Sequence, residues 1–410
     1  MNYYNEKIYI ELQEYVPSCL PQQTMPSELA EHLWKNHSNQ INVEFPSPIT
    51  DQMVRLTSKG WIGYIPLTKH TFLYLKPKVN LKNVFRMLEY AYGLKSFQFL
   101  DGLIECETLK EFFEYLAQFL SICVLNRSRK GLYRAYIPKT DTLPYACGRL
   151  IVKHSINRPW EVKLPYLFED HTPDIRDNQI LAWTLFCIAR SGLCTERTLP
   201  VTRKAYRSLR GMVSKNPCTS KDCIRIFYNR LNNDYKPLHA LCRFFLDHIG
   251  PSHELGGREM LPFLVNMNHL YERFVARWLK ENMPSDFDLK IQEKIDITED
   301  GSLFFRIDIV IYDMKTKTVI AVLDTKYKTP DTPDKSDINQ AIAYAEVKGC
   351  QVAVLIYPEP LKYPINKKFG RIRVFTMTFS LSGNLDLSGK NFLNNLGLLK
   401  LLQFRNQQAL

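Results

Sequence analysis

The strongest chemical signal in this sequence is a pair of acidic residues, each set inside an apolar run. Asp308 interrupts FFRIDIVIY (residues 304–312), and Asp324 lies near the end of TVIAVLDTKYK (residues 318–328), two residues before Lys326. Side chains two apart on a strand leave the same face, so Asp324 and Lys326 share a face if this run is a strand. Two carboxylates close to each other repel and raise one pKa unless a cation lies between them.

A divalent cation would resolve that repulsion. Mg²⁺ prefers one or two carboxylates together with water and phosphate oxygens, and Mn²⁺ is expected to substitute for it. Asp308, Asp324 and Lys326 are therefore candidate catalytic residues for metal-assisted phosphodiester hydrolysis, with Lys326 as an ammonium beside the scissile phosphate. The candidate metal ligands are Asp308, Asp324 and Glu272. For any one of these residues alone, an ordinary ion pair at a strand end explains the sequence better.

Two strands and a helix must position these side chains. Residues 304–312 and 318–328 are rich in β-branched and aromatic residues and flank a short polar turn, which predicts a hairpin. If the hairpin pivots at Thr316, Asp308 lies opposite Asp324, because both are equally far from the pivot. Upstream, residues 266–280 have helical apolar spacing with Glu272 at the edge of the stripe.

A second helix is predicted after the hairpin. Ser336 is a candidate N-cap for a helix at 337–348, and Gly349 suits its C-terminal end. Gln340 and Tyr344 are four residues apart and so share a face of this helix. They would orient the lysine or contact a phosphate; an exposed Gln and a packed Tyr are the alternative interpretation.

The rest of the chain predicts a multidomain protein that mixes α+β and α/β elements. Further strands are expected at 7–12, 52–56, 61–64, 71–75, 351–357 and 371–375, and further helices at 81–92, 108–126, 177–190 and 236–246. The segment GPSHELGG at 250–257 has the composition of a linker. We therefore expect three parts, at 1–165, 166–255 and 256–410.

An excess of basic residues favours an anionic partner. Lys and Arg total 54 against 42 Asp and Glu, a net charge of +12, and nucleic acid is the first partner to expect. Within the helical part at 166–255, basic residues recur three and four positions apart at Arg203, Lys204, Arg207 and Arg210. This face is a candidate DNA-binding site, and a solvated helix surface is the alternative.

Composition excludes several classes of protein. Hydrophobic residues make up 45% of the 410 residues, which excludes a disordered tail protein. No apolar run approaches the roughly 20 residues of a membrane span and no secretory signal is visible, so a cytoplasmic protein without a membrane partner is expected. The ten cysteines lack the paired spacing of a zinc site and are expected to be mostly free thiols in a reducing compartment.

The acid–acid–lysine set resembles the PD-(D/E)xK nuclease superfamily, in its RecB-like branch with a Q-x3-Y motif. That resemblance implies a mixed sheet flanked by helices, like that of restriction endonucleases, for residues 256–410. The matching residues are Glu272, Asp308, Asp324, Lys326, Gln340 and Tyr344. One residue departs from the pattern, because Ile307 stands where the motif often has proline; proline is not a ligand there, so the chemistry is unaffected.

Over almost its whole length the sequence also resembles the McrC family. The segments that carry this likeness are WIGYIP at 61–66, KPK at 76–78, VFRMLEYAY at 84–92, GRLIV at 148–152 and LYERFVARWL at 270–279. The resemblance implies the endonuclease subunit of a McrBC-like, type IV restriction system, whose N-terminal part at 1–165 docks into a hexamer of McrB-like AAA+ GTPase subunits and stimulates their hydrolysis. The partner would select double-stranded DNA carrying modified cytosine. The sequence has no GxxxxGK[ST] motif, so no nucleotide is expected on this chain itself.

Two other functions remain open from the sequence. The chain could be a stand-alone RecB-like nuclease of repair or mobile-element defence, which would cut DNA without a motor. It could instead be a non-catalytic cofactor of a motor, with the acidic pair merely structural. The intact acid–acid–lysine set disfavours the cofactor, and a full N-terminal domain without catalytic residues disfavours the stand-alone nuclease.

Overall fold

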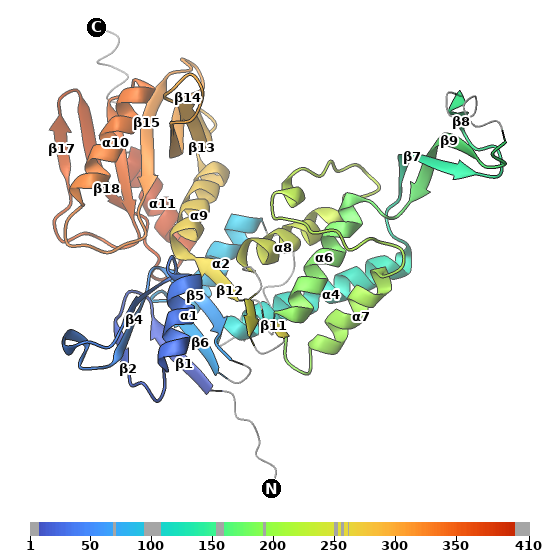
Figure 1. Ribbon diagram of the computed structural model, residues 1–410. Helices are drawn as coiled ribbons and strands as arrows, with labels where there is room; N and C mark the ends of the chain where they lie inside the picture. The colour runs from blue at the N-terminus through green and yellow to red at the C-terminus, as the bar shows by residue number, and fades with distance from the viewer. Residues whose placement is uncertain are drawn as a thin grey trace. The chain divides into compact units, whose positions relative to one another are not determined.

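The computed structural model describes most of the chain. The described residues are 8–68, 71–93, 108–152, 160–191, 194–249, 253–255, 258–260 and 262–397. They fold into two compact units, one formed by Met1–Gln98 together with Leu264–Leu410 and the other by Phe99–Phe263. The first unit therefore contains both ends of the sequence, drawn in blue and in orange to red in Figure 1.

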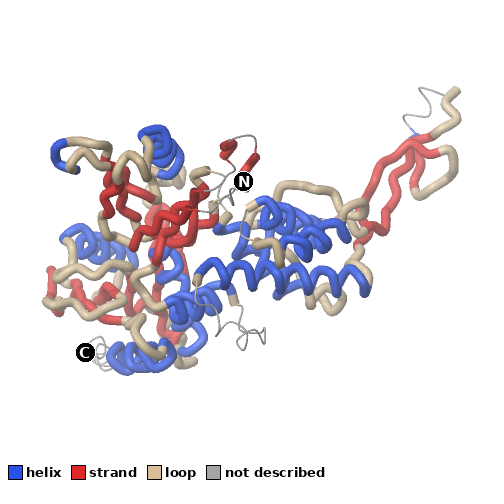
Figure 2. Tube along the Cα trace, turned by 90° about the horizontal axis from the view of Figure 1, so that it is seen from below, coloured by secondary structure: helices blue, strands red, loops and turns tan. Residues whose placement is uncertain are grey.

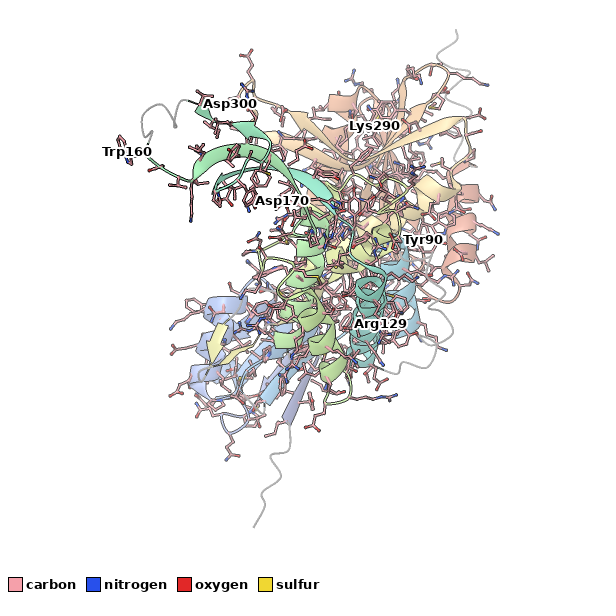
Figure 3. All side chains as sticks on the ribbon, turned by 90° about the vertical axis from the view of Figure 1, so that its right-hand side faces the viewer. Tyr90, Arg129, Trp160, Asp170, Lys290 and Asp300 are labelled. Carbon is pink, nitrogen blue, oxygen red and sulfur yellow. The ribbon has the colours of Figure 1, made fainter. Side chains whose placement is uncertain are left out.

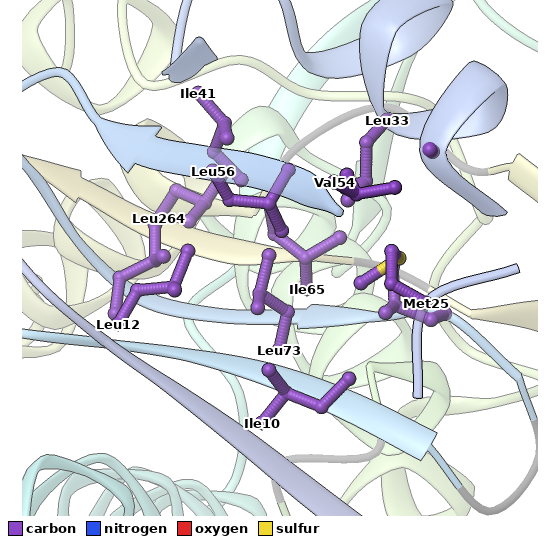
Figure 4. Packing of buried hydrophobic residues seen from close by; sticks show 13 residues of the cluster. Ile10, Leu12, Met25, Leu33, Ile41, Val54, Leu56, Ile65, Leu73 and Leu264 are labelled. Carbon is purple, nitrogen blue, oxygen red and sulfur yellow. The ribbon is translucent and has the colours of Figure 1, made fainter. Parts of the chain in front are cut away.

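The N-terminal part of the first unit contains two small sheets. Its elements are β1 (Ile8–Gln13), β2 (Ser18–Leu20), α1 (Ser27–His37), β3 (Ile41–Glu44), β4 (Val54–Ser58), β5 (Trp61–Pro66), β6 (Thr71–Lys76), α2 (Leu81–Tyr92) and, from later in the chain, β12 (Phe263–Asn266). The strand orders are β1-β6-β5-β12 and β2-β4-β3. Buried residues alternate along β1, and Ile10 and Leu12 join Leu73 and Leu75 of β6 in a core shared with α1 (Figure 4).

The C-terminal part of the first unit is built on a six-stranded sheet. Its elements are α9 (Met267–Asn282), β13 (Phe287–Asp296), β14 (Phe304–Asp313), β15 (Val319–Thr325), α10 (Lys335–Lys348), β16 (Val352–Tyr357), β17 (Asn366–Phe369), β18 (Ile372–Thr378) and α11 (Leu385–Leu396). The strand order is β13-β14-β15-β16-β18-β17, antiparallel from β13 to β15 and parallel from β15 through β16 to β18. β16 is buried at every position because it lies inside the sheet and packs against α10.

Helix α9 is fixed by aromatic packing. The rings of Phe274 and Trp278 lie 5.3 and 5.4 Å from that of Phe379, which follows β18. Helix α11 approaches so closely that a Cβ at Gly389 would lie 2.3 Å from Cζ2 of Trp278, so only glycine fits there. These contacts hold the helix that carries Glu272 in one orientation relative to the sheet.

The second unit is mainly helical and carries a β arm. Its elements are α4 (Leu109–Lys130), β7 (Ala135–Leu143), β8 (Arg149–Leu150), β9 (Leu164–Thr172), α6 (Arg176–Arg190), α7 (Leu199–Leu209), α8 (Tyr235–His248), β10 (His253–Leu255) and β11 (Arg258–Met260). Strands β7, β9 and β8 form the arm, which extends away from the helices (Figure 2). Trp160, 75% exposed, lies at its outer end (Figure 3).

The predicted division into 1–165, 166–255 and 256–410 differs from the observed one. Its first boundary falls inside β9, which pairs with β7 over its whole length. Its second boundary lies close to the observed change of unit at Phe263. The first unit is discontinuous because β12 completes the sheet begun by β1, a long-range pairing that composition does not reveal.

Several elements differ from the sequence predictions. The predicted N-cap at Ser336 is wrong, because α10 begins at Lys335 and its N-cap is Asp334. The predicted C-terminal Gly349 is confirmed, with a φ of +66°. Helix α4 continues to Lys130 because its last turn is basic, which suits the negative end of the helix dipole. Strand β13 and helices α1 and α11 were not predicted.

The predictions about membrane spans and about the cysteines can be compared with the described residues. None of the described helices combines the length and the apolar character that crossing a bilayer requires. The nine cysteines within the described ranges are free thiols, and five of them are buried. Cys106 lies outside the described residues.

Candidate active site

The hairpin of β14 and β15 brings the two predicted carboxylates to the same end of the sheet. The strands pair antiparallel with Ile309 opposite Leu323. The ladder ends at this pair, and the same register carried one residue further toward the open end of the hairpin puts Asp308 opposite Asp324. The predicted pivot at Thr316 agrees with this part of the ladder, because Ile309 and Leu323 lie equally far from it, whereas a β-bulge between Ile311 and Tyr312 shifts the pairing nearer the turn to Tyr312 opposite Val319.

Asp308 is held by the middle residue of the Asp-Thr-Lys motif. The backbone N–H and the hydroxyl of Thr325 donate hydrogen bonds of 2.9 and 2.8 Å to Oδ2 of Asp308. Both bonds favour the charged carboxylate, yet burial raises the pKa of Asp308 above its ordinary value. Thr325 was not singled out in the sequence, although its place between Asp324 and Lys326 would have indicated it.

Asp324 is a buried carboxylate with an incompletely satisfied oxygen. The Nζ atom of Lys326 lies 2.8 Å from Oδ2 of Asp324. Within the described part of the chain, Oδ2 has no further polar partner beside this close ion pair. The pKa of Asp324 is raised to about 7, mainly by burial, with the charge of Asp308 adding to the rise and Lys326 opposing it.

Lys326 is oriented by the two residues predicted on α10. Its Nζ donates a 2.9 Å hydrogen bond to Oε1 of Gln340, and Nε2 of Gln340 donates a 2.6 Å bond to the hydroxyl of Tyr344. Gln340 is exposed and Tyr344 is buried, yet both belong to this chain of hydrogen bonds. Burial alone would lower the pKa of Lys326, but Asp324 and the other nearby acids raise it, so the ammonium stays charged.

Glu272 reaches the site from α9 and meets a residue that the sequence did not indicate. The Nε2 atom of Gln292, on β13, donates hydrogen bonds to Oε1 of Glu272 and, at 3.3 Å, to Oδ1 of Asp308. Burial raises the pKa of Glu272 to about 8, and the neighbouring charge of Asp308 adds to the shift. β13 was not predicted, although Phe287, Leu289 and Ile291 alternate with polar residues as in a half-buried strand, so Gln292 had no structural context in the sequence analysis.

Another acid, Asp337, is buried close to Lys326. Asp337, in the first turn of α10, has Oδ1 at 3.8 Å from Nζ of Lys326 and Oδ2 at 2.6 Å from Nζ of Lys328. Its negative charge contributes to the raised pKa of both Lys326 and Asp324. Asp337 was expected only as a helix residue, because nothing in its spacing indicated that it faces β15.

The carboxylate oxygens of Asp308, Asp324 and Glu272 are the type of ligand that a divalent cation prefers. Burial raises the pKa of Asp308, Asp324 and Glu272, repulsion from neighbouring carboxylates adds to the rise for Asp324 and Glu272, and Oδ2 of Asp324 is an under-satisfied acceptor. Among the described residues, no three His, Cys, Asp or Glu side chains are close enough to hold a metal ion together as they stand. Mg²⁺ commonly binds through only one or two carboxylates, which Asp308 and Asp324 provide.

The predicted basic face lies in the other unit. Arg203, Lys204 and Arg207 are exposed on α7, and Arg210 is its exposed C-cap. Their spacing gives one positive helix surface, as expected from the sequence. Its contact with DNA stays a prediction.

Comparisons with known proteins place the chain in a family. The family described as "McrBC 5-methylcytosine restriction system component" matches residues 56–358. The chain is also 24% identical over 216 residues to the type IV methyl-directed restriction enzyme EcoKMcrBC of Escherichia coli strain K12. That alignment covers 51% of this chain and 61% of the relative.

The fold is similar to that of a solved structure. A chain of the refined half-complex from the tetradecameric assembly of Thermococcus gammatolerans McrB AAA+ hexamers with bound McrC aligns with a TM-score of 0.54 and 17% identity. The alignment covers 95% of this chain and all of that chain. The mixed α and β fold expected from the sequence is thereby confirmed. Because the family match spans most of the sequence, the chain belongs to the family of McrBC 5-methylcytosine restriction system components, which confirms the resemblance drawn from its motifs.

Proposed function

We propose that this chain is the DNA endonuclease subunit of a McrBC-like type IV restriction system and cuts DNA by metal-assisted phosphodiester hydrolysis. The observation that carries the proposal is the convergence of Asp308, Asp324 and Lys326 at one end of the β14–β15 hairpin. The element order α9, β13, β14, β15, α10, β16 supports a PD-(D/E)xK nuclease fold for this part of the chain.

The residues present fit a hard divalent cation. Asp308 and Asp324 would hold Mg²⁺, with Glu272 as a third candidate ligand, and Mn²⁺ is expected to substitute. When bound, such an ion supplies polarisation of a phosphoryl oxygen and a lowered pKa for water.

The protein's own side chains supply position and charge. Thr325 fixes the carboxylate of Asp308 through two hydrogen bonds, so its other oxygen has a defined direction. Lys326 remains protonated, because its pKa is raised, and therefore stabilises negative charge that develops on the phosphate rather than accepting a proton. Gln340 and Tyr344 orient the Lys326 ammonium, which limits the reorganisation needed during the reaction.

The proposed partner is a McrB-like AAA+ GTPase hexamer, whose GTP hydrolysis this chain would stimulate. The similar Thermococcus gammatolerans assembly of McrB AAA+ hexamers with bound McrC supports this pairing. The partner would select double-stranded DNA carrying modified cytosine and would bind the nucleotide, and the complex would act in the cytoplasm. The basic face at Arg203, Lys204, Arg207 and Arg210 is a candidate for sequence-independent phosphate contacts.

Purification of the tagged chain from its native host in the presence of GTP tests this function. We expect a stoichiometric AAA+ GTPase to co-purify, and the complex to cut methylated DNA only with GTP and Mg²⁺. Robust Mg²⁺-dependent cutting by the chain alone would instead support a stand-alone nuclease. Calorimetry that detects no difference in divalent-metal binding between the wild type and an Asp308→Ala, Asp324→Ala double variant would support a non-catalytic cofactor.

A further inference from the structure

Gln292 has an unusual backbone at a specific place in the sheet. Strand β13 pairs with β14 in the same register on both sides of Gln292, with Ile291 opposite Ile309 and Glu293 opposite Ile307, and the ladder is interrupted between these two pairs. Gln292 therefore stands opposite Asp308. Its φ is +53°, in the left-handed region that residues with a Cβ rarely adopt within a strand.

The side chain of Gln292 connects two acids from different elements. One amide nitrogen, Nε2, donates hydrogen bonds to Glu272 on α9 and to Oδ1 of Asp308 on β14. The other oxygen of Asp308, Oδ2, is already occupied by Thr325. With both oxygens of Asp308 hydrogen-bonded, the carboxylate has one orientation before any cation arrives.

The chemistry of an amide suits this position. A lysine or arginine between the two acids would neutralise the charge that a cation requires, whereas the neutral amide bridges them and leaves that charge in place. A glycine at 292 would adopt the observed φ without strain but would provide no bridge. Strained backbone persists where the surroundings demand it and often marks a functional site.

We propose that Gln292 is a positioning residue that sets the separation of Glu272 and Asp308 for a divalent cation. This inference rests on the proposed nuclease function and adds a residue that the motif does not contain. Gln292 acts through the acids rather than on the reacting phosphate. Residues that orient metal ligands in this way typically contribute about 10- to 100-fold to metal affinity.

Binding of Mn²⁺ to the full-length chain, measured by calorimetry without DNA, tests the proposal. Gln292→Gly relieves the backbone and removes the amide, so we expect an unchanged or higher thermal unfolding midpoint together with Mn²⁺ binding weakened about tenfold. Gln292→Asn keeps an amide and tolerates the same φ, and we expect it to recover part of the affinity. In cleavage assays with the partner, Gln292→Gly should raise the Mg²⁺ concentration for half-maximal rate and leave the rate at saturating Mg²⁺ within a few-fold of wild type.

A matched control separates backbone strain from the amide. Lys317, in the exposed turn between β14 and β15, has a φ of +60°. Lys317→Gly gives the same kind of backbone relief without touching an acid of the site, so its Mn²⁺ affinity should equal that of wild type. If wild type binds Mn²⁺ and Gln292→Gly binds it equally well, the role of Gln292 is overturned while the proposed function stands. If wild type itself binds no Mn²⁺, both are overturned.

Discussion

The hydroxyl of Tyr327 donates a 3.1 Å hydrogen bond to Oε2 of Glu14, which ties the residue after Lys326 to the N-terminal part of the same unit. The backbone N–H of Lys78 donates to the same oxygen at 3.3 Å, and the Lys78 ammonium lies 5.0 Å from the centre of the Tyr327 ring. Glu14 is only 2% exposed, and its other carboxylate oxygen has no hydrogen-bond partner among the described residues. Tyr327, just after β15, is therefore anchored to Glu14, which lies 313 positions away in sequence.

Glu14 makes the stability of this unit depend on pH. Burial raises its pKa from 4.5 to about 7, although hydrogen bonds from Lys78 and Tyr327 oppose the shift. The folded state holds the proton more tightly than the unfolded chain, so this contribution is full below pH 4.5 and is lost as pH rises through about 7. In wild type, Glu14 should lower the free energy of unfolding by about 3 kcal/mol as the pH rises from 4.5 through 7. In Glu14→Gln we expect this fall to be absent. Urea unfolding at several pH values measures both.

The neighbouring acid on β1 provides the control for that measurement. Glu11 is exposed and pairs with Lys76 at 2.5 Å. Glu11→Gln removes an exposed acid of the same type, and a change of slope confined to Glu14→Gln would assign the effect to Glu14. An unchanged slope in Glu14→Gln would show that Glu14 is not protonated in the folded chain.

Tyr327→Phe tests the anchor itself. Loss of the hydroxyl removes one of the hydrogen bonds to the buried Glu14, and we expect a loss of about 1–3 kcal/mol in unfolding free energy at pH 7. Chemical denaturation of the full-length variant measures this loss. Unfolding at the wild-type midpoint would mean that the bond to Glu14 contributes no net stability.

Metal affinity is expected to rise with pH. The pKa values of Asp324 and Glu272 are raised to about 7 and about 8, mainly by burial, so at pH 6 a cation must displace their protons. Binding of Mn²⁺ should therefore tighten between pH 6 and 8 and release protons. Calorimetry in two buffers of different ionisation enthalpy counts the protons released, and an affinity that is flat over this range would contradict the assignment of these acids as ligands.

Lys326 and its supporting residues should contribute unequally to the cleavage rate. Lys326→Met removes the ammonium and is expected to reduce cleavage by about 100- to 1000-fold, as for the loss of one charge-stabilising donor. Gln340→Leu leaves the ammonium without one of its acceptors, and we expect about a tenfold loss. Tyr344→Phe should have a smaller effect, because Lys326 keeps its bond to Gln340. Equal rates for Lys326→Met and wild type would exclude the proposed role of this lysine.

Local patterns in the sequence predicted much of the site. The predicted turn at Thr316 placed Asp308 opposite Asp324, because the two residues are equally far from it in sequence, and the pairing of Ile309 with Leu323 agrees. The spacing of Gln340 and Tyr344 placed both on one face of a helix, where they do contact Lys326 through Gln340. These relationships depend on residues close in sequence, which is why periodicity was sufficient.

The remaining features depend on long-range packing. The positive φ of Gln292 and the burial of Glu14 have no signature in residue type or spacing. The first unit combines both ends of the sequence through β12, which pairs with β5. Strand β13 is different: its apolar residues alternate with polar ones, so a local pattern was present and was not used. Ser336 was a plausible N-cap by type, but the helix begins one residue before it.

The most direct test of the central claim is cleavage of methylated DNA by the chain together with its co-purified GTPase, comparing wild type with Asp324→Asn. Asp300→Asn is the control, because Asp300 is an exposed acid in the turn between β13 and β14 (Figure 3). We predict that wild type and Asp300→Asn cut DNA with Mg²⁺ and GTP, while Asp324→Asn binds the partner and supports GTP hydrolysis but cuts no DNA. Cleavage by Asp324→Asn at the wild-type rate would contradict the assignment of Asp308, Asp324 and Lys326 as the nuclease site.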